Sequence, residues 1–155
     1  MNLDKVQIRL AVPDDAPRLL ELVMELALYE KAPDEVRTKP EDYRSGLESG
    51  LFKALVAESS DLGILGMALF FPYFSTWGGK TLYLEDFIVS KSFRGHGLGK
   101  KLFDALLETA RRESARKMKW QVLDWNESAK TFYRSYGATM ITGWETGVIQ
   151  LDDQC

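Results

Sequence analysis

Three glycines at alternate positions, Gly95, Gly97 and Gly99, stand directly before a segment with the pattern of an amphipathic helix. A glycine-rich turn before a helix lets backbone N–H groups approach an anion closely, and the helix N-terminus adds the positive end of its dipole. Pyrophosphate is the ligand that such a turn suits. A plainer interpretation also fits, in which the glycines only permit a tight turn.

Two nucleotide-binding motifs do not fit this turn. The P-loop requires Gly-Lys followed by Ser or Thr, whereas Lys101 follows Lys100 here. The dinucleotide fingerprint requires a glycine at the position of Lys100, and it follows the first strand of a βαβ unit. Neither a P-loop nor a dinucleotide site is therefore expected.

Five further residues bear on chemistry. Glu85 and Asp86 are adjacent carboxylates on a predicted strand, and because side chains alternate along a strand, only one of them is expected to enter a given pocket. Tyr133 lies in an aromatic helical stripe, which is usually part of a core. His96 is the only histidine and Cys155 the only cysteine, so no catalytic triad, metal site or disulfide is expected.

These residues need strands and helices to position them. Alternation and turn signals predict strands over 6–12, 52–59, 63–74, 81–89, 117–125 and 147–151. Helical spacing of apolar residues predicts helices over 13–30, 98–111 and 126–137. Asn126 is the expected N-cap of the last helix, and Gly137 lies past its end. The polar stretch 31–50 receives no element.

The order of these elements predicts an α/β (α+β) domain with a mixed sheet. A chain of 155 residues most simply forms one domain, 1–155. The formal net charge of −3 disfavours non-specific nucleic-acid binding. The N-terminus lacks the apolar core of a signal peptide and no run is long enough to span a bilayer, so we expect a cytoplasmic protein without membrane partners.

The segment "RGHGLG", Arg94 to Gly99, fits the Arg/Gln-x-x-Gly-x-Gly/Ala signature of the GNAT N-acetyltransferases, whose backbone amides hold the pyrophosphate of coenzyme A. The segments "LYLEDFIVSKSFRGHGLGKKL", "WNESAKTFYRSYGA" and "LALYEKA" resemble the spermidine/spermine subgroup, which includes thialysine acetyltransferases. The resemblance covers nearly the whole chain. It implies the GNAT acyl-CoA N-acyltransferase fold, a mixed, mostly antiparallel central sheet flanked by helices, and an acetyl-CoA-dependent enzyme.

The same resemblance implies which residues bind acetyl-CoA. The strand beside the acetyl and pantetheine groups carries Phe87, Ile88 and Val89. The phosphate-binding loop comprises Arg94, Gly95, His96, Gly97, Leu98, Gly99 and Lys100. The far side of the pantetheine is flanked by Asn126, Glu127, Ser128 and Ala129, and Tyr133 becomes the general acid beside the sulfur. Tyrosine suits the role of general acid, because with a pKa near ~10 it is protonated at neutral pH and can donate its proton to the departing thiolate.

On the acceptor side, the resemblance implies that Glu85 takes the amine proton, directly or through water, or attracts a cationic substrate. The implied amine pocket comprises Tyr29, Glu30, Ser75, Trp77, Glu85, Lys119, Trp120 and Gln121. The polyamine enzymes carry acids where Ser75 and Thr142 stand here, so a short diamine or a lysine-like amino acid such as thialysine fits better than spermine. Members of the subgroup form homodimers, and no metal is implied.

Two other functions remain open at this point. One is a protein acetyltransferase acting on peptide lysines or N-termini, which would need an open groove. The other is a regulatory module that binds coenzyme A without catalysis, which would need "RGHGLG" but neither Tyr133 nor Glu85.

Overall fold

The computed structural model describes residues 2–151, so Cys155 lies outside the described residues. The chain divides into two compact units, 1–120 and 121–155. Among the described residues, none of the helices has both the length and the apolar character needed to cross a membrane.

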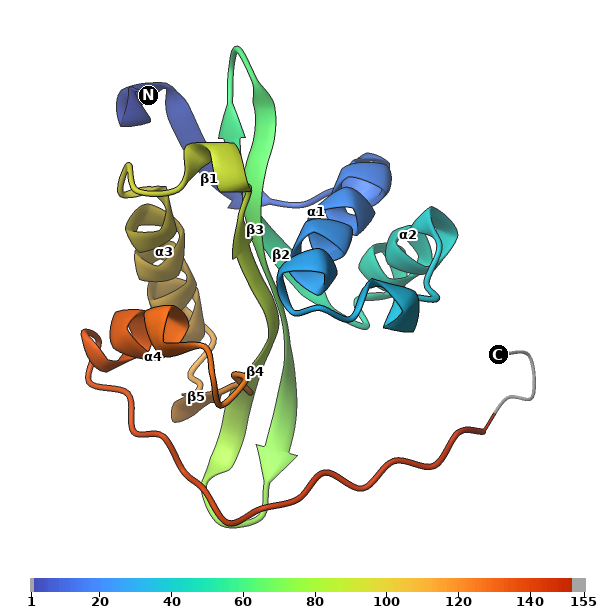
Figure 1. The fold of residues 1–155 in the computed structure, drawn as a ribbon, viewed down its shortest axis with the longest axis vertical. Coiled ribbons are helices and arrows are strands. Elements are labelled where there is room, and N and C mark those ends of the chain that lie inside the picture. The colour runs from blue at the N-terminus through green and yellow to red at the C-terminus, as the bar shows by residue number, and fades with distance from the viewer. Residues whose placement is uncertain (1, 152–155) are drawn as a thin grey trace. The chain divides into compact units, whose positions relative to one another are not determined.

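The first unit is built on a five-stranded sheet whose strands lie in the order of the sequence (Figure 1). The strands are β1 (Val6–Leu10), β2 (Lys53–Ser59), β3 (Gly63–Ser75), β4 (Gly79–Val89) and β5 (Lys117–Lys119). The first four pair antiparallel with their neighbours, and β5 pairs parallel to β4. This confirms the predicted mixed, mostly antiparallel sheet, with the long β3–β4 hairpin at its centre.

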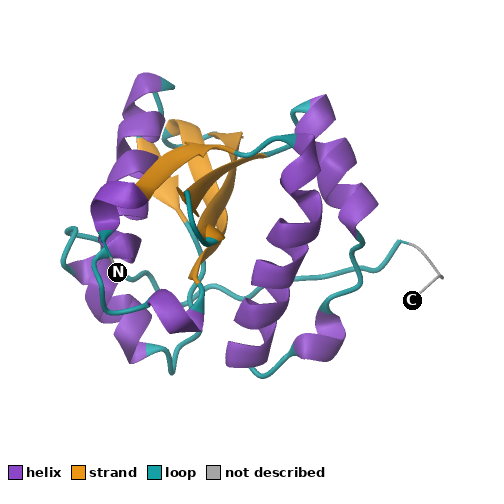
Figure 2. Ribbon diagram, turned by 90° about the horizontal axis from the view of Figure 1, so that it is seen from above, coloured by secondary structure: helices purple, strands orange, loops and turns teal. Residues whose placement is uncertain are grey.

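Helices cover both faces of this sheet, as Figures 1 and 2 show from two directions. The helices of the first unit are α1 (Ala16–Tyr29), α2 (Pro40–Ser49) and α3 (Leu98–Arg112). Short 3-10 turns are formed by η1 (Leu3–Lys5), η2 (Pro13–Asp15), η3 (Pro33–Glu35) and η4 (Lys91–Phe93). Helices α1 and α2 form one core with Val56 and Ile88, whereas α3 packs its Leu98 with Ala57 and Val89. Neighbouring strand residues thus serve opposite faces, as strand alternation requires.

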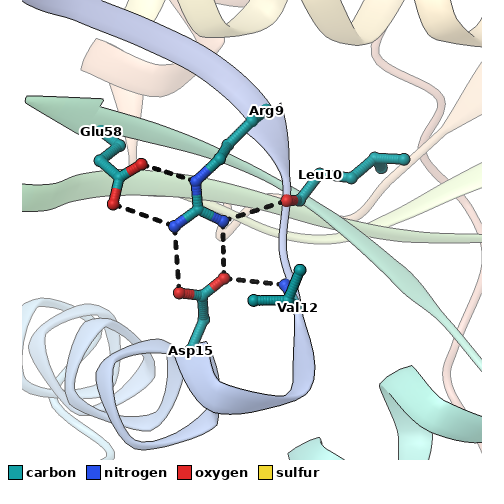
Figure 3. Close-up of polar contacts among 5 residues, drawn as sticks. All are labelled: Arg9, Leu10, Val12, Asp15 and Glu58. Atoms are coloured by element: carbon teal, nitrogen blue, oxygen red, sulfur yellow. Dashed lines mark hydrogen bonds and ion pairs between the residues drawn. The ribbon is translucent and has the colours of Figure 1, made fainter.

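Arg9 joins β1, β2 and the start of α1 in one polar network (Figure 3). Its guanidinium donates to Glu58 at 2.6 and 3.0 Å and to Asp15 at 2.8 and 3.1 Å. The Asp15 carboxylate also accepts the N–H of Val12 at 2.8 Å. We call Arg9, Asp15 and Glu58 the Arg9 clamp. Hydrogen bonding to Arg9 holds the pKa of both carboxyls below their usual values.

Helix α2 was not expected from the sequence, although its boundaries carry clear signals. Pro40 is its first residue, and the Asp42 carboxylate accepts the Lys39 N–H at 2.7 Å, which caps the helix start. Gly50 ends it in the left-handed conformation, with φ of 71°. The prediction overlooked these signals because the stretch is polar and has few apolar residues at helical spacing.

Two predicted strands were too long or wrong. The predicted strand 117–125 is formed only over Lys117–Lys119, where it pairs with residues 81–83 of β4. Residues 147–151 were predicted as a strand, but they are exposed and have no regular structure. A β-strand needs a neighbour that satisfies its backbone groups, and these residues pair with no strand among the described residues.

The second unit contains helix α4 (Glu127–Arg134). Asn126 is its N-cap, as predicted, because its side chain accepts the N–H of Ala129 at 3.2 Å. Gly137 follows the helix with φ of 80°, in the left-handed region where glycine is favoured.

Candidate active site

Strand β4 contains a bulge at Glu85. Asp86 pairs with Leu69, and Leu84 pairs with Phe70, so Glu85 has no partner on β3. A bulge of this kind bends the strand and redirects side chains. The alternation rule therefore does not hold at this point, and the expectation that Glu85 and Asp86 serve opposite faces loses its basis.

The carboxylates at the bulge act on one another. Asp86 precedes Ile88 by two residues on the same strand, and Ile88 packs in the core below α1. Burial, with repulsion from Glu85 and Glu30, raises the pKa of Asp86 to about 6. Burial also raises the pKa of Glu30, at the end of α1. We call Glu30, Glu85 and Asp86 the bulge carboxylates.

Among the described residues, no cation balances this group. Within residues 2–151, the side chains of Glu30, Glu85 and Asp86 form no ion pair or hydrogen bond. Glu30 and Asp86 are partly buried, whereas Glu85 is exposed. A carboxylate held away from water without a partner is unfavourable, and it persists where a ligand supplies the missing charge. The arrangement therefore suits a cationic group, such as a protonated amine.

The hydroxyl of Tyr43 on α2 belongs to the same neighbourhood. Burial raises the pKa of Tyr43, and the charges of Asp86, Asp42 and Glu85 raise it further. Its hydroxyl shares a hydrogen bond of 3.1 Å with the Thr38 hydroxyl, which acts in the opposite direction. Tyr43 thus stays protonated, as a neutral polar group near the bulge carboxylates.

Beyond β4 the chain enters the glycine loop, residues 94–99. Gly95 and Gly97 have φ of 78° and 81°, a region that side chains disfavour, so glycine is required for this turn. A Cβ added at Gly95 would meet nothing within 4 Å, which leaves that side of the loop open. Helix α3 begins at Leu98, and the first amides of a helix lack intrahelical acceptors. Backbone donors beside an open loop fit the pyrophosphate of coenzyme A.

The strand residues predicted to flank acetyl-CoA divide between the two faces of the sheet. Phe87 meets Phe103 of α3 edge to face, with ring centroids 5.4 Å apart, and Val89 packs with Leu98. Ile88 packs on the α1 side. Phe87 and Val89 therefore lie on the face of the sheet that α3 covers, and the glycine loop leads directly into that helix.

The predicted acceptor residues fall into separate places in the first unit. Glu30 acts on Asp86 at the bulge, whereas the ring of Tyr29 lies 5.4 Å from the guanidinium carbon of Arg94, at the glycine loop. Lys119 pairs with Tyr83 across β4 and β5, and Trp120 meets Phe103 edge to face.

Ser75 and Trp77 lie at the tip of the β3–β4 hairpin. The Ser75 hydroxyl accepts the Gly78 N–H at 3.2 Å, so it holds the turn, and Trp77 is 91% exposed. Glu85 is six residues along β4 from Gly79, about 20 Å at the usual strand rise. The structure therefore does not bring the tip residues to the bulge carboxylates.

The remaining predicted residues lie in the second unit. Glu127, Ser128 and Ala129 form the first turn of α4, and Tyr133 is buried near its end. The ring of Tyr133 meets that of Phe132 at 5.6 Å, edge to face. Gln121 donates to the Thr146 hydroxyl at 3.1 Å.

Sequence reasoning did not select Asp86 as a site residue, although a signal was present. Ile88, two residues after Asp86 on the same side of the bulge, is buried in the core, so Asp86 occupies a position where an apolar residue is expected. An acid in an otherwise apolar series marks a functional candidate. As for metals, the described residues contain no group of three or more His, Cys, Asp or Glu side chains that is suited to hold one.

Comparisons with known proteins agree with this geometry. Residues 17–138 match the acetyltransferase (GNAT) family. Thialysine N-epsilon-acetyltransferase of Bos taurus is 35% identical over 151 residues, which cover 90% of this chain and 89% of that protein. Spermidine/spermine N(1)-acetyltransferase-like protein 1 of Homo sapiens is 32% identical over 154 residues, 92% of this chain and 22% of its own length.

The fold is shared with solved structures at lower identity. An aminoglycoside acetyltransferase from an uncultured soil metagenomic sample superimposes with a TM-score of 0.78 at 19% identity, covering 96% of this chain and 98% of that one. The family match spans most of the chain, and the expected helices, the glycine loop and the mixed sheet without its last predicted strand are present. The chain belongs to the GNAT family of acetyltransferases and is an acetyl-CoA-dependent N-acetyltransferase.

Proposed function

We propose that this enzyme acetylates the primary amine of a small diamine, a polyamine or a lysine-like amino acid, and that both units, residues 1–155, act as a single catalytic domain. The observation that carries the proposal is the group of bulge carboxylates, which have no balancing cation within the described part of the chain. Glu85 and Asp86 lie on β4, the strand that leads into the glycine loop, and Glu30 lies at the end of α1. An amine held there would sit at the acetyl end of a bound acetyl-CoA.

The acceptor amine must lose a proton before it attacks. A free amine has a pKa near ~10.4 and is cationic at neutral pH, which attracts it to the carboxylates. Asp86, with a pKa of about 6, is mostly ionised at pH 7 and is a stronger base than an ordinary aspartate. Glu85 was our candidate from the sequence; we now propose that Asp86 shares the task of binding the cation and receiving its proton.

On the donor side, the departing thiolate of coenzyme A must gain a proton. As the amine nitrogen forms its bond to the acetyl carbon, the bond from that carbon to sulfur breaks and the thiolate gains a proton. Tyr133 is the proposed source of that proton, while the glycine loop, residues 94–99, and Lys100 hold the phosphates. The strand residues 87–89 and the start of α4, residues 126–129, flank the pantetheine in this proposal.

The acceptor is proposed to be short. Where the polyamine-acetylating relatives carry an acid, Ser75 uses its hydroxyl to hold the hairpin turn. A distant second ammonium would lose an attraction of ~1 kcal/mol or more at about 4 Å. The carboxylate nearest to the reacting amine remains, so a short diamine or a thialysine-like amino acid fits better than spermine. Relatives named thialysine acetyltransferases support this choice. We retain Tyr29, Lys119, Trp120 and Gln121 as proposed contributors to the pocket, and we leave out Trp77, which lies at the hairpin tip away from the bulge carboxylates.

We further propose a homodimer in the cytoplasm, with a small amine and acetyl-CoA as its ligands and with neither nucleic acid, membrane nor metal. Support for the dimer comes from the exposed apolar side chains of the segment after α4, among them Trp144, Val148 and Ile149, which are 80%, 72% and 84% exposed. A second copy would cover such residues.

The test is thiol release from acetyl-CoA with a panel of diamines, polyamines, lysine analogues and peptides, using wild type and Tyr133→Phe. We expect turnover of short diamines or lysine analogues, and a kcat about 100-fold lower in Tyr133→Phe. Tyr136→Phe, three residues after Tyr133 and just past the end of α4, is the matched control and should retain wild-type kcat.

Each alternative has its own outcome in this assay. Turnover of peptides but not free amines would identify a protein acetyltransferase. Tight binding of acetyl-CoA without transfer to any acceptor would identify a regulatory module. Wild-type kcat in Tyr133→Phe would remove Tyr133 from the mechanism.

A further inference from the structure

Helix α1 holds the segment that connects β4 to the glycine loop. The carboxylate of Glu25 accepts the Ser90 hydroxyl at 3.1 Å with one oxygen and the Lys91 N–H at 3.4 Å with the other. Ser90 is only 9% exposed. One carboxylate on α1 therefore binds both residues that begin this segment.

These two hydrogen bonds cap a turn from outside. Ser90 is the N-cap of η4, but its side chain makes no capping bond within that turn. The N–H of Lys91 is the first of the turn and needs an acceptor. Glu25 supplies it from another helix, and the Ser90 N–H is held separately by the Leu65 carbonyl at 2.8 Å.

The end of the segment is held by the same helix face. The Nε of Arg94 donates to the Val89 carbonyl at 2.8 Å, and its guanidinium lies over the Tyr29 ring. Tyr29 follows Glu25 by four residues, so both lie on one side of α1. Gly95, the first glycine of the loop, comes directly after Arg94.

Glu25 is itself held in place. Its carboxylate lies 3.7 Å from the Arg18 guanidinium, whose Nε donates to the Ile64 carbonyl of β3 at 3.0 Å. The other nearby acid, Glu21, pairs with Arg18 at 2.8 Å. A carboxylate does not bind pyrophosphate, so any effect of Glu25 on that ligand must pass through the segment that it caps.

We propose that Glu25 is a positioning residue, which fixes residues 90–94 so that the amides of the glycine loop are preset for the pyrophosphate of acetyl-CoA. This inference rests on the proposed function of the loop. It predicts a defect confined to the phosphate-bearing part of the donor, because the acetyl and pantetheine groups lie along β4 rather than on the loop.

The experiment compares two donors, acetyl-CoA and S-acetylpantetheine, which lacks the pyrophosphate and nucleotide. In Glu25→Gln, which keeps the side-chain shape but not the charge, kcat/KM for acetyl-CoA should fall about 10-fold while that for S-acetylpantetheine stays within about twofold of wild type. Glu25→Ala should show a larger drop of the same kind. Glu21→Gln, which loses a partner of Arg18 but no contact to the segment, should keep the wild-type ratio.

Calorimetric titration with coenzyme A alone separates this inference from the proposed function. If wild type binds no coenzyme A, the proposed function fails. If wild type binds it and Glu25→Gln binds it equally well, the role of Glu25 is overturned. Equal losses for both thioesters would also overturn it, since they would indicate general damage rather than positioning.

Discussion

Two groups of acidic side chains in the first unit have opposite surroundings. In the Arg9 clamp, Asp15 and Glu58 flank one guanidinium, and their pKa values are lowered by it. Among residues 2–151, the bulge carboxylates act on one another and on the hydroxyls of Tyr43 and Tyr83, and burial raises the pKa values of Asp86 and Glu30. The first group includes its own counter-ion, Arg9, whereas the second has none among the described residues and suits a cationic ligand.

The difference separates residues that hold the fold from residues that serve the reaction. The Arg9 clamp ties the edge strand β1 to β2 and to the start of α1, far along the chain from the glycine loop. Among the bulge carboxylates, Asp86 and Glu30 destabilise the fold at neutral pH, since burial penalises their charged forms. A protein retains such a group where a cationic ligand gains from it.

The largest expected effect concerns the acceptor. In Asp86→Asn, kcat/KM for the amine should fall about 100-fold, because the variant can neither balance the ammonium charge nor take its proton. Steady-state kinetics with varied amine at saturating acetyl-CoA measure this. Asp61→Asn, which removes an exposed ion pair with Lys5, is the control and should keep wild-type values. Equal kcat/KM in the two variants would place the acceptor elsewhere.

The pH dependence of kcat/KM for the amine tests the same role of Asp86. As the pH falls through about 6, Asp86 takes up a proton and its attraction for the amine is lost. The kcat/KM for the amine should therefore fall about 10-fold for each pH unit below that value. In Asp86→Asn this break should disappear from the profile. An unchanged break would assign it to another group.

Breaking the Arg9 clamp should affect stability and not chemistry. In Arg9→Met, the free energy of unfolding at pH 7 should fall by about 1–3 kcal/mol, because two partly exposed carboxylates lose their partner. Their folded-state pKa values lie below the unfolded ones, so their stabilisation is present above the unfolded values and is lost as the pH falls. Urea unfolding measures the free energy of unfolding of wild type and Arg9→Met at pH 7 and at pH 3. The difference between the two proteins should be smaller at pH 3. A kcat changed more than about twofold would contradict the separation.

The smallest expected effect is a gain in stability, in contrast to the loss expected for Arg9→Met. The pKa of Asp86 is higher in the folded state than in the unfolded chain, so its contribution to stability is full below the unfolded value and is lost as the pH rises through about 6. Asp86→Asn should therefore raise the free energy of unfolding by about 1–2 kcal/mol at pH 8, and by much less at pH 4. Glu58→Gln should lower it at pH 8. If both variants shift stability in the same direction, the two groups do not differ as described.

Much of the first unit was predictable because its signals are local. Strands β1 to β4, helices α1 and α3, and the Asn126 cap all follow from side-chain periodicity and from turn and cap residues. Helix α2 carried the same boundary signals but too few apolar residues for its period to stand out. The strand predicted over 147–151 was wrong, because apolar alternation alone cannot supply a neighbouring strand.

The sequence by itself determined the family and the donor, since the glycine loop and its Arg94 are contiguous residues whose spacing sets a backbone conformation. Only the tertiary structure decided which acids matter. The bulge at Glu85 depends on the register between β3 and β4, and the pKa of Asp86 depends on burial and on Glu30, which lies 56 residues earlier in the chain. Charge and desolvation act through space, so neighbours distant in sequence decide whether a carboxylate is an ordinary acid or part of a site for an amine.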